Sequence, residues 1–164
     1  MANMFNKNNW KEPIYKNDLI NVILNGLIAG IFGGLLAGAI DYLFIMLNSY
    51  ITFGLVILAY LVGWRISKGY YSFHVLYPII SIACLTLGLA FSFAMELLLR
   101  LQFNFQAFFQ FLGTYVLSGF YMPFANPIIF IINGNVISFL LSIISLACYV
   151  IAYIICYKVA SKGR

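Results

Sequence analysis

The segment from Asn25 to Asp41, NGLIAGIFGGLLAGAID, constrains this chain more than any other stretch. Glycine recurs there every fourth residue, at Gly26, Gly30, Gly34 and Gly38. A second row of small residues, which contains Gly33, lies beside this first row. Four-residue spacing places each row along one helix face. In water each interior glycine costs a helix about 1 kcal/mol relative to alanine. In lipid the backbone must satisfy its own hydrogen bonds, so the helix forms despite its glycines. We therefore expect the central helix of a membrane bundle, a glycine zipper whose flat grooves let another helix approach.

The composition also indicates a membrane protein. Hydrophobic residues make up 64% of the 164-residue chain and charged residues only 8%, with a mean hydropathy of +1.00. Soluble domains carry roughly 25% charged residues, so a soluble fold is excluded. The net charge of +5 comes from lysines and arginines in the tails and short connections, the usual positions of membrane topology signals. We expect the lipid bilayer as the environment and no nucleic acid as a partner.

Long apolar segments divide the chain. Residues 1–17 are predicted to be a tail and residues 18–164 a single membrane domain, because about 20 apolar residues cross the hydrocarbon core. The predicted spans cover residues 19–43, 46–64, 75–97 and 136–157. Asn17 or Asp18 is expected to cap the first helix, and Gly54 and Gly63 to pack against it. The small residues at 37–39 resemble a signal cleavage site, but the apolar run continues past them, so we expect an uncleaved span.

Residues 103–130 differ from the predicted spans. Polar residues recur there every fourth position, and aromatic and aliphatic residues lie opposite: the polar stripe is Gln102, Gln106, Gln110, Thr114 and Ser118. This pattern predicts an amphipathic helix with an aromatic face, either interfacial or re-entrant. Pro123 and Pro127 are expected to interrupt any helix that continues.

The distribution of basic residues selects the topology. With four spans and a cytoplasmic N-terminus, eight of the nine lysines and arginines lie inside and only Arg100 lies outside. A fifth span would reduce this asymmetry to five against four. Because basic residues favour the cytoplasmic side, we expect four spans with both termini cytoplasmic, in a cell membrane.

Few side chains could carry chemistry within the membrane. Asp41, Glu96 and Arg100 all fall near the outer boundary in the four-span topology, so one hypothesis is a polar cluster at the outer mouth of the bundle. The alternative is that each is an ordinary boundary residue, with Glu96 and Arg100 forming a simple helix pair.

Polar residues near the cytoplasmic boundary can have either a structural or a functional role. Asn21 and Asn25 lie one turn apart on the first helix and can hydrogen-bond between helices or line a pathway. His74 is expected to be an interfacial residue at the inner end of the third span.

No motif for catalysis or cofactor binding is present. The sequence lacks a nucleophile motif, a phosphate loop and a metal-ligand cluster, and its three cysteines, Cys84, Cys148 and Cys156, lie in apolar segments as expected for core residues. We expect neither an enzyme nor a cofactor or metal.

Two stretches, GGLLAGAI and LVILAYLVGWRISKG, are followed by a third apolar span after a short basic turn. This arrangement resembles small bacterial multi-span membrane proteins of uncharacterised function, in which a glycine-rich first helix precedes a second ending in glycine and arginine, here Gly63 and Arg65. The resemblance implies a membrane architecture and no particular activity. The abundance of Asn, Lys, Ile, Phe and Tyr is compatible with a bacterial source.

The sequence thus favours a structural or accessory membrane protein. It would act through helix–helix association, using the glycine grooves and the aromatic segment, as a homo-oligomer or within a larger membrane complex. The alternative is a small transporter, a substrate-binding membrane subunit or a channel. A third interpretation is lipid or cell-envelope binding through the aromatic segment.

Overall fold

The described part of the chain is all-α, as predicted. The computed structural model describes residues 13–47, 53–133 and 136–162, so most of the predicted tail, the connection at 48–52 and the turn at Gly134 lie outside the described residues. The described residues form five helices and no strand. The helices are α1 (Lys16–Met46), α2 (Phe53–Ser67), α3 (Leu76–Arg100), α4 (Phe105–Ile132) and α5 (Val136–Ala160).

Four of these helices are long and apolar enough to cross a membrane: α1, α3, α4 and α5. The sequence also predicts four spans, but the two sets differ. The predicted span at 46–64 corresponds to α2, which has only 15 residues, whereas residues 103–130 fall in α4, which has 28. At 1.5 Å per residue α2 measures about 22 Å, against a hydrocarbon thickness of about 30 Å. The lengths support a multi-pass membrane protein.

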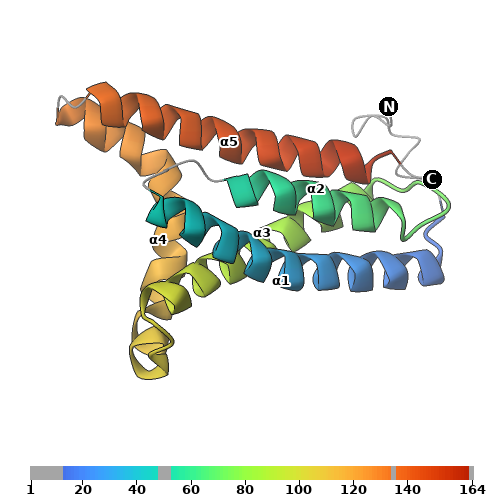
Figure 1. The fold of residues 1–164 in the computed structure, drawn as a ribbon. Coiled ribbons are helices and arrows are strands. Elements are labelled where there is room, and N and C mark those ends of the chain that lie inside the picture. Colours follow the sequence, from blue (N-terminus) through green and yellow to red (C-terminus); the bar gives the residue numbers. More distant parts are fainter. Residues whose placement is uncertain (1–12, 48–52, 134–135, 163–164) are drawn as a thin grey trace.

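The helices form a bundle with one crosswise member (Figure 1). α1 packs most extensively against α3 and α2, and α2 packs in turn against α5. The start of α1 and the end of α5 lie at the same end of the bundle. For most of its length α4 runs across the direction of α1 and α5, and its last part lies beside the start of α5 (Figure 1). Within the described chain α4 contacts only α3 and α5.

The first glycine row of α1 packs against α3. A Cβ atom on Gly34 would collide with the carbonyl of Gly88, and one on Gly38 with the carbonyl of Ser92. Small residues therefore face each other on both helices, so the backbones touch without intervening side chains. The row is buried within the chain, as are its remaining members Gly26 and Gly30.

The second small-residue row of α1 faces α2. A Cβ on Gly33 would lie 3.0 Å from the side chain of Leu58, and one on Gly54 would lie 2.6 Å from the carbonyl oxygen of Ala37. Gly54 thus packs against the first helix as expected. Gly63 does not: its nearest neighbours are Cys156 and Val159 of α5, because the opposite side of α2 faces that helix.

The expectation that prolines interrupt the helix after residue 118 is wrong. α4 continues through Pro123 and Pro127. Proline lacks the N–H that would bond the carbonyl four residues earlier, which for Pro123 is the carbonyl of Gly119. The Tyr149 hydroxyl of α5 donates to that oxygen at 3.2 Å. A side chain from the neighbouring helix thus satisfies the freed carbonyl, and the helix persists.

The start of α4 also differs from the expected pattern. Gln102 and Phe103 adopt left-handed backbone conformations, with φ of 51° and 62°, at the turn between α3 and α4. The helix begins at Phe105, where the Asn104 side chain accepts a hydrogen bond from Ala107 N at 3.2 Å. Gln102 therefore lies outside the helix, and the polar stripe on α4 begins at Gln106.

Candidate functional site

Asp41 joins α1 to the start of α2. Its carboxylate is buried and accepts a hydrogen bond from Gly54 N at 2.9 Å. Gly54 lies in the first turn of α2, where backbone N–H groups have no partner inside their own helix. A carboxylate at that position is also favoured by the helix dipole. Asp41 therefore acts as a cap supplied by another helix.

Glu96 joins α3 to α4. Its carboxylate accepts hydrogen bonds from Arg100 Nε at 2.9 Å and from the Tyr115 hydroxyl at 2.7 Å, and Arg100 Nη2 lies 2.7 Å from the same oxygen. The predicted pair of Glu96 with Arg100 is therefore present. The hydrogen bond from Tyr115 of α4 could not be predicted, because the spacing of residues along one helix gives no information about a partner on another helix.

The three residues of the proposed polar cluster thus divide into two sets. A Cβ atom on Gly38 would lie 3.0 Å from the Cβ of Met95, so Asp41 and Glu96, which follow these residues on α1 and α3, lie in the same region of the bundle. Within the described residues, however, no hydrogen bond or ion pair joins Asp41 to Glu96 or to Arg100. The contacts present link helices rather than surround a ligand.

Asp18 has a tertiary role in place of the expected cap. The residue that precedes α1 is Tyr15, whose side chain makes no capping hydrogen bond. The buried Asp18 carboxylate instead accepts from Tyr71 N at 3.1 Å and from Ser72 N at 3.4 Å, in the connection between α2 and α3. Two carboxylates near opposite ends of α1 therefore bind the first turn of α2 and the connection that follows α2.

The remaining polar candidates make local contacts. Asn21 is exposed, Asn25 is half-buried, and the Asn25 amide donates to the Asn21 carbonyl at 2.8 Å along the same helix. Neither lies in the buried core. His74 is buried, and its Nδ1 accepts from Leu76 N at 3.0 Å, which satisfies a backbone donor at the start of α3.

The centre of the bundle is apolar. Leu58, Val62 and Leu85 are fully buried there. Cys84 and Cys156 are buried beside this core, and all three cysteines are free thiols. Across the described residues no group of three or more His, Cys, Asp or Glu side chains is arranged to hold a metal ion.

The surface of α4 is largely exposed, which the sequence pattern predicts only in part. Pro123 is its single buried residue in the part of the chain that is described. Near its middle, Phe120 meets Phe93 of α3 with ring centroids 5.4 Å apart, and Tyr115 and Gly119 make the bonds given above. Nearer its end, Phe130 lines a hollow shared with Leu141 of α5. Most of its aromatic and aliphatic side chains are left uncovered: Phe105, Phe109, Phe111, Leu117, Tyr121, Phe124, Ile128 and Ile131.

No family model, curated protein or solved structure matches this chain. The resemblance to small bacterial multi-span proteins therefore stays an expectation.

Proposed function

We propose that this protein is a structural or accessory subunit of a membrane assembly and acts through helix–helix association rather than through catalysis. The observation that carries this proposal is α4, a long helix with a single buried residue that is uncovered over most of its apolar surface. An exposed apolar surface of this extent marks either contact with lipid or contact with a partner.

The association surface differs from the one that the sequence suggests. The glycine grooves of α1 are already occupied by α2 and α3 of the same chain. A partner helix, from a second copy or from another membrane protein, would therefore bind α4 and not α1.

The proposed membrane arrangement has α1, α2, α3 and α5 crossing and α4 lying along the interface. Its support is the crosswise direction of α4 in Figure 1 and the exposure of Gln106, Gln110 and Thr114, which an interfacial helix would turn to water. The ends of α2 and α5 lie where α1 begins (Figure 1), and the basic residues Arg65, Lys68 and Lys158 fall in or directly after these helix ends. We assign this end of the bundle to the cytoplasm of a bacterial cell.

Transport is not proposed, because the bundle centre is apolar and the asparagines suggested as a pathway lining lie outside it. The described residues show no observation that favours a channel or a substrate site in the interior.

A matched pair of phenylalanines tests the proposal. Phe109 on α4 and Phe32 on α1 are exposed to similar extents, 71% and 65%. After native extraction in mild detergent, we expect the wild type and Phe32→Gln to migrate as a stoichiometric assembly, and Phe109→Gln to lose its partner. A wild-type monomer without a partner, or equal behaviour of the two variants, would contradict the proposal.

A further inference from the structure

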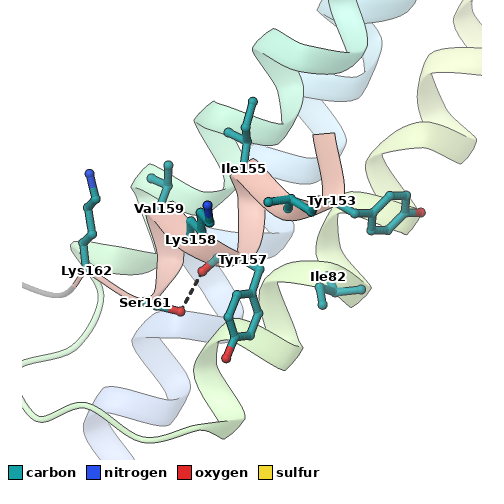
Figure 2. Close-up of a pocket in the computed structure, with 9 residues that line it drawn as sticks. Ile82, Tyr153, Ile155, Tyr157, Lys158, Val159, Ser161 and Lys162 are labelled. Carbon is teal, nitrogen blue, oxygen red and sulfur yellow. Dashed lines mark hydrogen bonds between the residues drawn. The ribbon is translucent and has the colours of Figure 1, made fainter. Parts of the chain in front are cut away.

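A groove follows the outer side of α5 near its C-terminal end. Its volume is about 880 Å³, and its wall is formed by α5 residues together with Ile82 of α3. Figure 2 shows the two basic residues, Lys158 and Lys162, toward the end of the chain, and Tyr153 and Ile82 on the side of the groove away from Lys162. The lining is largely apolar, with amines confined to one end.

A second hollow continues this groove toward α4. It has a volume of about 390 Å³ and is lined by Phe120 and Phe124 of α4 and by Val150 of α5. Tyr153 and Ile154 line both hollows, so the two adjoin along the surface of α5, and we call them together the apolar channel. From Val150 to Lys158 the helix rises about 12 Å, which is most of the roughly 15 Å depth of one hydrocarbon leaflet.

The polar groups at the mouth of the groove suit an anion. Lys158 and Lys162 are exposed, and no acidic residue lines the groove. Tyr157 lines the same groove, but its hydroxyl points away from the two amines (Figure 2), so the lysines alone provide the positive charge for an anion.

We propose that this groove binds one anionic phospholipid from the leaflet at the end where α1 begins. The phosphate lies against Lys158 and Lys162, and an acyl chain follows the channel past Ile154 toward Phe120. The inference is independent of the proposed association through α4, because it depends on α5 and requires only that the chain lies in a bilayer.

Charge complementarity favours a lipid over a second copy of the chain. The three acids in the described residues are all engaged: Asp18 and Asp41 are buried in hydrogen bonds, and Glu96 is paired with Arg100. A second copy therefore presents none of these carboxylates to the two lysines, whereas an anionic lipid carries both the charge and the apolar chain that the groove requires.

Native mass spectrometry of the purified full chain tests the headgroup. The detergent-solubilised protein is offered equal amounts of phosphatidylglycerol and phosphatidylcholine with identical acyl chains. We expect the wild type to retain the anionic lipid with an enrichment of about thirtyfold, because each of the two lysines contributes about 1 kcal/mol. The variant Lys158→Gln/Lys162→Gln should lose this enrichment. The control Arg65→Gln/Lys68→Gln, at the same end of the bundle but outside the groove, should keep it.

A second pair of variants tests the apolar channel. Ile154 and Ile144 are both exposed on α5, at 46% and 50%, but only Ile154 lines the groove. We expect Ile154→Trp to reduce binding of both lipids and Ile144→Trp to leave it unchanged, with unfolding temperatures of the two variants alike.

Four results would overturn the proposal. They are equal retention of the two lipids by the wild type, an equal loss in the Arg65/Lys68 control, undiminished binding in Ile154→Trp, and a lipid-free wild-type dimer that Ile154→Trp dissociates.

Discussion

At the scale of single residues, the polar side chains of this protein join helices. Asp41 binds a backbone N–H in the first turn of α2, Asp18 binds two in the connection after α2, and Glu96 binds Tyr115 of α4. Each contact pairs a strong acceptor with a donor that the membrane would leave unsatisfied. This explains why a chain with only four acids buries two of them without a visible ligand site.

The contact between Tyr149 and the Gly119 carbonyl leads to a prediction. Tyr149→Phe leaves that carbonyl without a partner, because Pro123 cannot supply one, and should lower the free energy of unfolding by about 1 kcal/mol. Pro123→Ala restores a helical N–H, so Tyr149→Phe should cost much less in that background. Unfolding in detergent of the two single variants and the double variant measures the coupling. Additive effects would show that the hydroxyl and the proline act separately.

At the scale of helices, close packing of α1 on α3 depends on paired small residues. Gly34 and Gly88 meet backbone to backbone, so there is no side chain that can move aside when a methyl group is added. Overpacking of this kind costs about 1–3 kcal/mol even where neighbouring side chains can shift.

Gly34→Ala should therefore destabilise the protein by about 2 kcal/mol or more. The matched control is Gly113→Ala in α4, where an added Cβ meets no atom within 4 Å. Because alanine favours helix by up to about 1 kcal/mol, this control should be neutral or slightly stabilising. Thermal unfolding in one detergent compares the two. Equal stability of the two variants would mean that the α1–α3 contact is looser than the structure shows.

At the scale of the whole molecule, the environment of α4 determines the topology. If α4 lies along the interface, a cysteine at Gln110 should react with a membrane-impermeant maleimide in intact cells, and one at Phe109 should not. The background for this experiment has Cys84, Cys148 and Cys156 changed to alanine. If neither cysteine reacts with the maleimide and a C-terminal reporter lies outside the cell, then α4 crosses the membrane and the two termini lie on opposite sides.

Parts of this architecture follow from local sequence. The spacing of glycine from Gly26 to Gly38 predicts a helix with two small-residue faces, and apolar length predicts α1, α3 and α5 close to their observed bounds. The ion pair of Glu96 with Arg100 also follows, because residues four apart on a helix are neighbours. These features depend on contacts within one helix or on burial in lipid, which the sequence pattern encodes directly.

Other features were decided only by the tertiary structure. The sequence could not show that α2 and α3 fill the glycine grooves of α1, because a flat groove accepts any helix that is close. Asp18 was expected to cap its own helix and instead binds a connection more than 50 residues away. Pro123 was expected to end α4, but the hydroxyl of Tyr149 supplies the missing hydrogen bond from α5. In each case the partner is distant in sequence, and a polar group in a membrane takes whichever partner the packing of the helices brings to it.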